Sequence, residues 1–206
     1  MLILKNNVQH YLMGITKTKA LLIDVARQLF AKKGVENTTM NDIAKASRKG
    51  RRTLYTYFKN KEELYMAVVK SELEILWERL QRVAERDTPP EKKIIEVILT
   101  RLEAVKEIVY RNGTLRASFF RDIWSVEKVR KRFDSKEIQL LRDILLEGVE
   151  KNVFTVSDVD MTAALLHYSL KGVEVPFIRG QIGVNMDAKS KKRLVTEIIF
   201  GALQKK

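Results

Sequence analysis

Apolar residues recur at helical spacing in almost every segment of this 206-residue chain. Between residues 18 and 34, for example, Leu22, Ala26, Leu29 and Phe30 would form one stripe along a helix. No segment shows the sustained apolar–polar alternation that a half-buried strand requires. Three prolines and nine glycines are also few for a turn-rich β fold. The pattern therefore predicts an all-α protein.

Capping residues and breakers divide the chain into about nine predicted helices. Thr39 with Asp42 has the form of a capping box, and Pro90 suits the first turn of a helix. Ser135 and either Ser157 or Asp158 are expected as further N-caps, and Pro176 predicts a kink or a helix end. The predicted helices cover 18–34, 40–47, 51–58, 61–86, 90–110, one or two within 114–133, 135–150, 158–176 and 187–204.

Positive charge is concentrated near the amino end. The chain has 39 Lys and Arg against 26 Asp and Glu, a net charge of +13, of which residues 1–70 carry +9 and residues 71–206 carry +4. Such an excess favours an anionic partner, either nucleic acid or a membrane surface. The alternative from charge alone is a solvated basic face without a partner.

Other residue types exclude several classes of site. Cysteine is absent, and His10 and His167 are the only histidines, which leaves little for a metal centre or a Ser-His-Asp triad. The sequence has no glycine-rich phosphate loop and no HExxH motif. We therefore expect no enzyme activity, no cofactor and no metal. The longest apolar runs have four or five residues, far from the roughly 20 that cross a bilayer, so a cytoplasmic protein without a membrane partner is expected.

The segment 38–58 has the pattern of a helix-turn-helix. A short capped helix is followed by a turn that contains Gly50, and a second short helix begins with Arg51 and Arg52. In this motif the second helix lies in the major groove and presents its first residues to base edges. The planar guanidinium of arginine can bind guanine or phosphate through two hydrogen bonds. The segment therefore predicts double-stranded DNA as the partner.

Four motifs in this region resemble the DNA-binding domain of the tetracycline-repressor (TetR) family. They are F-x-x-K-G at 30–34, T-T-M-x-D-I-A at 38–44, T-L-Y-x-Y-F at 53–58 and K-x-K-E-E-L at 59–64. The resemblance covers roughly residues 18–66. It implies an all-α regulator with an N-terminal three-helix DNA-binding domain at 18–62 and a helical effector-binding and dimerisation domain at 63–206. Residues 1–17 are expected to be an arm, either disordered or partly upstream of a natural start at Met13.

The resemblance also assigns the residues expected to contact operator DNA. Arg51, Thr53 and Tyr55 are expected at or near base edges, and Arg52 at a base or a phosphate. Backbone contacts are expected from Thr39, Tyr57 and Lys61.

The chain departs from the family pattern at the turn of the motif. Members commonly have Ala-Gly-Val-Ser where this chain has Ser47-Arg48-Lys49-Gly50. Gly50 can begin a helix but has no side-chain oxygen with which to cap it. The geometry of the turn, and hence the register of the following helix, is therefore open. Arg48 and Lys49 add two cations to Arg51 and Arg52, which predicts strong phosphate attraction and a steep dependence of DNA binding on salt.

For the second domain the resemblance implies a homodimer that pairs through helices within about 158–204, and an unknown small-molecule effector. The function it implies is a repressor that the effector releases from its operator. Aromatic side chains are the predicted lining of the effector pocket, with core packing as the alternative for each: Trp77, Tyr110, Phe120, Trp124 and Tyr168. A basic helical protein that binds nucleic acid without sequence specificity and without an effector is the alternative function.

Overall fold

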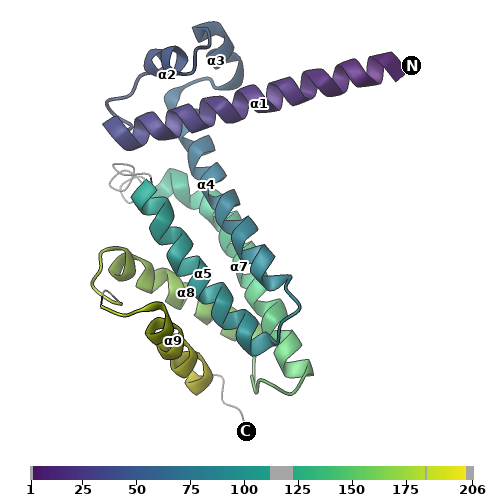
Figure 1. Cartoon of the computed structure of the whole chain (residues 1–206), viewed down its shortest axis with the longest axis vertical. Coiled ribbons are helices and arrows are strands. Elements are labelled where there is room, and N and C mark those ends of the chain that lie inside the picture. The colour runs from purple at the N-terminus through teal and green to yellow at the C-terminus, as the bar shows by residue number, and fades with distance from the viewer. Residues whose placement is uncertain (1, 112–122, 184, 203–206) are drawn as a thin grey trace. The chain divides into compact units, whose positions relative to one another are not determined.

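The computed structural model describes the backbone at residues 2–111, 123–183 and 185–202, and the side chains at 16–111, 130–183 and 185–201. These residues form eight helices and no strand, which confirms the predicted all-α class (Figure 1). The chain divides into two compact units. The first comprises Met1–Glu72 with Arg111–Val129, and the second comprises Leu73–Tyr110 with Arg130–Lys206.

The first unit contains α1 (Leu2–Lys33), α2 (Met40–Ala46), α3 (Arg51–Tyr57) and the beginning of α4 (Lys61–Ala84). Its core joins the apolar stripe of α1 to the inner faces of the shorter helices. Phe30 and Tyr65 meet edge to face, with ring centroids 6.2 Å apart. The buried side chains are Leu22, Ala26, Phe30, Ile43, Ala44, Leu54, Phe58, Leu64, Tyr65, Val68 and Val69.

α1 begins well before the predicted position. Its backbone is helical from Leu2, so Thr18 lies inside the helix and the expected arm at 1–17 continues it. The sequence between residues 2 and 18 contains no proline, and Gly14 is its one glycine. That stretch therefore contains no proline to interrupt a helix that continues from the buried stripe.

The second unit contains the remainder of α4, α5 (Pro90–Arg111) up to Tyr110, α7 (Ile123–Glu150) from Arg130 onward, α8 (Val159–Ile178) and α9 (Ala188–Ala202). Pro90 lies in the first turn of α5 as predicted, and Asp158 caps α8 by accepting a hydrogen bond from the backbone N–H of Met161. These helices share one apolar core. It includes Leu80, Ile94, Ile98, Phe133, Leu141, Leu145, Phe154, Ala163 and Phe177.

The helix start expected at Ser135 is wrong. Ser135 does not cap a helix, because α7 runs without interruption from Ile123 to Glu150. The Ser135 hydroxyl donates instead to the carbonyl oxygen of Lys131 one turn earlier, at 3.0 Å, which accommodates serine inside a helix. Pro176 lies late in α8, as expected, and the helix ends two residues after it at Ile178. None of the described helices is long and apolar enough to cross a lipid bilayer.

Candidate nucleic-acid interface

The capping box at the start of α2 is present as the sequence predicts. The Thr39 hydroxyl accepts from the backbone N–H of Asp42 at 3.1 Å, and the Asp42 carboxylate accepts from the backbone N–H of Thr39 at 2.9 Å. The backbone N–H and the hydroxyl of Thr39 both donate to the Asp42 carboxylate. These two hydrogen bonds lower the pKa of Asp42, and Lys33 and Lys45 add to the effect. The cap therefore fixes the first residue of α2, and the Thr39 side chain remains exposed beside it.

The turn between α2 and α3 has an unusual backbone at Arg48. Its φ angle is 53°, in the left-handed region that favours glycine. Ser47 ends α2, and the backbone N–H groups of Arg48 and Lys49 donate to the carbonyl oxygens of Lys45 and Ala44. Arg48 therefore holds a backbone conformation that suits glycine, at the position where glycine is common in the sequence motif.

α3 begins at Arg51, with Gly50 as an N-cap that makes no side-chain hydrogen bond. This agrees with the predicted register of the second helix. Leu54 and Phe58 are buried, whereas Arg51, Arg52 and Tyr55 are exposed on the other side of the helix. One apolar face thus anchors α3 within the unit, and its basic and aromatic face is left for a partner.

The cations at this end of the unit are unpaired among the described residues. Arg48, Lys49, Arg51 and Arg52 are all exposed, and no ion pair joins any of them to a described carboxylate. Most other arginines with described side chains form ion pairs with acidic groups, as Arg27 does with Asp24 at 2.7 Å. Four free cations around the N-terminus of a short helix form a surface suited to the phosphates of a duplex.

The remaining predicted contacts lie at the edge of this surface. Thr53 and Tyr57 are half-buried on α3. Lys61, in the first turn of α4, donates from Nζ to the carbonyl oxygen of Glu36 at 3.3 Å. The structure therefore brings all nine predicted DNA-contact residues into one unit, in the segment from Thr39 to Lys61.

The three predicted effector residues whose side chains are described do not share one environment. Trp77 packs against the core of the second unit, whereas Tyr110 and Tyr168 are exposed. Phe120 and the side chain of Trp124 lie outside the described residues. Their role as pocket residues stays a prediction.

A cavity of about 400 Å³ lies elsewhere in the second unit, between α5, α8, α9 and the segment that joins α8 to α9. Its lining is almost wholly apolar and includes Leu102, Leu166, Leu170, Phe177, Val195 and Ile199. Lys191 is the cation in the lining, and its Nζ lies 5.6 Å from the Phe177 ring centroid and 3.7 Å from Glu103. Aliphatic residues from distant segments form this cavity, so no local sequence pattern indicates it.

Exposed apolar side chains follow one face of α8 and one face of α9. Met161, Leu165 and Tyr168 are spaced by four and three residues on α8, and Leu194 and Ile198 by four on α9. Leu165 and Ile198 are 60% and 61% exposed. Apolar stripes of this kind on a surface mark an interaction site.

The comparison with known families supports the DNA-binding assignment. The model for bacterial regulatory proteins of the tetR family matches residues 22–68, which include α2, α3 and the residues of the basic surface. A transcriptional repressor of Mycolicibacterium smegmatis, KstR2, is 29% identical over 146 residues, which cover 68% of this chain and 69% of the relative. A probable acrEF/envCD operon repressor of Escherichia coli K12 is 26% identical over 178 residues, covering 82% and 80%.

A solved structure has the same fold over nearly the whole chain. The transcriptional regulator FadR from Bacillus subtilis, in complex with stearoyl-CoA, superposes with a TM-score of 0.68 over 90% of this chain and 99% of that one. The sequence identity is 19%, so the likeness concerns the fold. With the family match, the repressor relatives and the helix-turn-helix geometry together, residues 22–68 form a DNA-binding domain of the TetR family, and the chain as a whole is similar to transcriptional regulators of that family.

Proposed function

We propose that this regulator is a homodimeric repressor that leaves its operator when a small-molecule effector binds its second unit. The observation that carries the DNA-binding part is the set of unpaired cations Arg48, Lys49, Arg51 and Arg52 around the start of α3. A recognition helix reads a duplex through the residues of its N-terminal end. Binding to chromosomal DNA also implies a cytoplasmic protein.

The contacts divide by the reach and chemistry of each side chain. Arg51, Thr53 and Tyr55 contact base edges, and Arg52 contacts a base or a phosphate. Arg48 and Lys49, in the turn, contact phosphates. Backbone contacts from Thr39, Tyr57 and Lys61 set the register of the helix in the groove.

The apolar stripes of α8 and α9 support pairing of two chains through the region 158–204. Leu165 and Ile198 are the most exposed large apolar residues of the two stripes, and a second copy would remove both from water. Leu165→Glu and Ile198→Glu place a charge in that contact. Both variants should convert the dimer into a monomer in analytical ultracentrifugation, and a wild-type protein that is monomeric at micromolar concentration would exclude this interface.

The cavity supports an effector with an extended apolar part and an acidic group. Its lining offers aliphatic side chains with Lys191 among them, and Lys106 lies 5.5 Å from the same Phe177 ring that Lys191 faces. The FadR relative from Bacillus subtilis carries stearoyl-CoA, a molecule of this class. We therefore propose a fatty acyl thioester or acid as the effector class.

The DNA-binding proposal is tested with the duplex upstream of the protein's own gene and a scrambled duplex of equal composition. Fluorescence anisotropy at several salt concentrations gives the two affinities. A specific regulator should bind its own duplex roughly 10³-fold or more tightly than the scrambled one. A ratio near one would leave only the alternative function, a basic protein that binds nucleic acid without specificity.

The effector proposal is tested in the same assay by adding stearoyl-CoA to the complex with the upstream duplex. The acyl-CoA should release the wild-type protein. Lys191→Met should raise the concentration needed, whereas Lys192→Met, a change of equal charge at an exposed neighbour, should not. Release that is equally easy in both variants would show that Lys191 does not contact the acidic group.

A further inference from the structure

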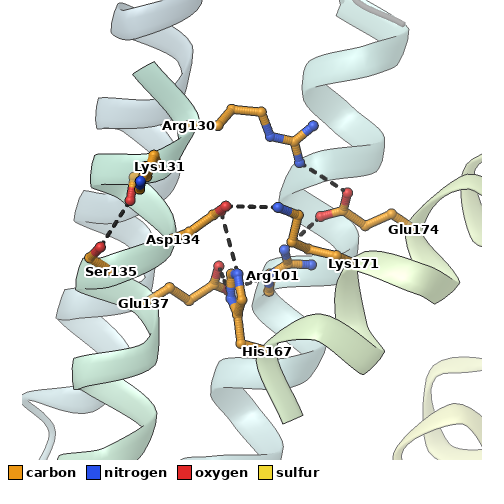
Figure 2. A network of polar contacts seen from close by, with 9 residues as sticks. All are labelled: Arg101, Arg130, Lys131, Asp134, Ser135, Glu137, His167, Lys171 and Glu174. Carbon is orange, nitrogen blue, oxygen red and sulfur yellow. Dashed lines mark hydrogen bonds and ion pairs between the residues drawn. The ribbon is translucent and has the colours of Figure 1, made fainter. Parts of the chain in front are cut away.

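A cluster of charged side chains lies in the interior of the second unit, apart from the apolar cavity (Figure 2). The Arg101 guanidinium donates to Glu137, and its Nη2 lies 2.7 Å from a Glu174 oxygen. Lys171 Nζ lies 2.7 Å from Asp134 Oδ2. Three helices contribute to this cluster: Arg101 from α5, Arg130, Asp134 and Glu137 from α7, and His167, Lys171 and Glu174 from α8.

Each α7 carboxylate has one oxygen bound to a cation and the other turned towards His167. Asp134 Oδ1 lies 3.4 Å from His167 Nε2, and Glu137 Oε2 lies 3.0 Å from His167 Nδ1. The His167 side chain is fully buried, and that of Glu137 is 1% exposed. Residues 134 and 137 are one helical turn apart, so both carboxylates face the same imidazole.

The polar atoms at the centre of this cluster are not satisfied. No hydrogen bond from the described residues reaches either ring nitrogen of His167 or Oε2 of Glu137. A buried polar atom without a hydrogen-bond partner destabilises the folded state. An imidazole that is buried between two carboxylate oxygens, with no aligned hydrogen bond to either, therefore indicates a bound cation.

We propose that Asp134, Glu137 and His167 form a binding site for a divalent first-row transition-metal ion. Taking one donor atom from each residue, the donors lie within 4.8 Å of one another. Two ligands held at about 2.0–2.2 Å from Zn²⁺ are about 3–4 Å apart. Because the two carboxylates face different ring nitrogens, one of them must move towards the nitrogen that binds the ion. One imidazole nitrogen with two carboxylate oxygens suits Zn²⁺ or Mn²⁺ better than the purely oxygen-seeking Mg²⁺.

The exposure of the cations in the cluster indicates which of them can leave when the ion binds. Arg101 and its partner Glu137 are both buried, so that pair stays in place. Lys171 is 23% exposed and can carry its ammonium group into solvent. Its departure frees Asp134 Oδ2 and lowers the positive charge beside the site. Lys171 and the ion are therefore alternative partners of Asp134.

A proton is the other cation that this site can hold. Burial lowers the pKa of His167, but the contacts with Asp134 and Glu137 outweigh it and leave the pKa raised. An imidazolium between the two carboxylates would satisfy the same atoms. The experiment must therefore separate metal binding from protonation.

Untagged full-length protein is stripped with a chelator, dialysed and titrated calorimetrically with Zn²⁺, Mn²⁺ and Mg²⁺. We expect one Zn²⁺ or Mn²⁺ per chain, weaker Mg²⁺ binding and a higher melting temperature with the bound ion. His167→Gln and Asp134→Asn should each weaken Zn²⁺ binding by at least about tenfold. His10→Gln should leave it unchanged, which excludes the other histidine.

Lys171→Met provides the sharper test, because it removes the competitor and keeps the ligands. It should tighten Zn²⁺ binding several-fold. Lys151→Met is the matched control, since Lys151 pairs with Glu147 at the same 2.7 Å outside the cluster and its loss should change nothing. A folded wild-type protein that binds neither Zn²⁺ nor Mn²⁺ would overturn the proposal and leave the proton as occupant. Zn²⁺ binding that survives in folded His167→Gln and Asp134→Asn would overturn it as well.

Discussion

Arg48 combines a strained backbone with a proposed DNA contact, and substitution separates the two. A non-glycine residue in the left-handed region costs roughly 1–2 kcal/mol. Glycine removes that strain but loses about 0.5–1 kcal/mol through the greater freedom of the unfolded chain. With φ at 53°, Arg48→Gly should therefore stabilise the first unit by about 0.5–1 kcal/mol. That gain corresponds to a rise in melting temperature of roughly 1–4 °C for a protein of this size.

Arg48→Ala is the matched control, because it removes the same charge and keeps the Cβ that causes the strain. Urea unfolding followed by circular dichroism should show the gain in Arg48→Gly and not in Arg48→Ala. Both variants should bind the operator more weakly, with the slope of log affinity against log salt reduced by about one. Equal stability of the two variants would refute the strain argument, and an unchanged slope would refute the phosphate contact.

Three further predictions follow from other parts of the molecule. Arg51→Ala should lose discrimination between the operator and scrambled DNA, whereas Lys61→Ala should weaken both about equally; equal losses in both variants would contradict the assigned roles. The pKa of Asp42 is lower in the folded chain than its value near 3.8 in the unfolded chain, so the ionised carboxylate of the capping box stabilises the fold. This contribution is fully present above the unfolded pKa and is lost as the pH falls through the folded pKa. Acid titration followed by amide exchange of α2 should show this loss, and Asp42→Asn should abolish its pH dependence. Gly148→Ala should destabilise the second unit by about 1–3 kcal/mol, since a Cβ there would lie 2.0 Å from the buried Phe154 ring; an unchanged midpoint in urea would contradict that packing.

Local signals predicted the DNA-binding part of the fold closely. Thr39 and Asp42 lie three residues apart and form the hydrogen bonds of the capping box with each other, so the start of α2 is visible in the sequence. The start of α3 at Arg51 follows from the helix boundary at Gly50. The helix start predicted at Ser135 is wrong because serine can either cap a helix or donate a hydrogen bond to the preceding turn of one. The packing of α7 decides which of these two roles the serine takes. The start of α1 carries no comparable capping signal.

The sites in the second unit were harder to predict because they depend on which helices meet. The cavity is built from aliphatic residues that look like ordinary core in sequence, such as Leu102 and Leu170. The charged cluster had a visible signal, since Asp134 and Glu137 lie one turn apart, and Lys171 and Glu174 follow His167 on one face of α8. The sequence cannot show that these two faces meet, so the count of histidines argued against a metal site.

Leu194 and Ile198 belong to two surfaces at once, because they line the apolar cavity and form the exposed stripe of α9. In the proposed dimer, each molecule that enters the cavity meets side chains that also hold the partner chain. Ligand occupancy and subunit association are then thermodynamically linked, and each alters the equilibrium of the other. The dose of inducer that switches the gene on would accordingly depend on how many copies of the regulator the cell contains.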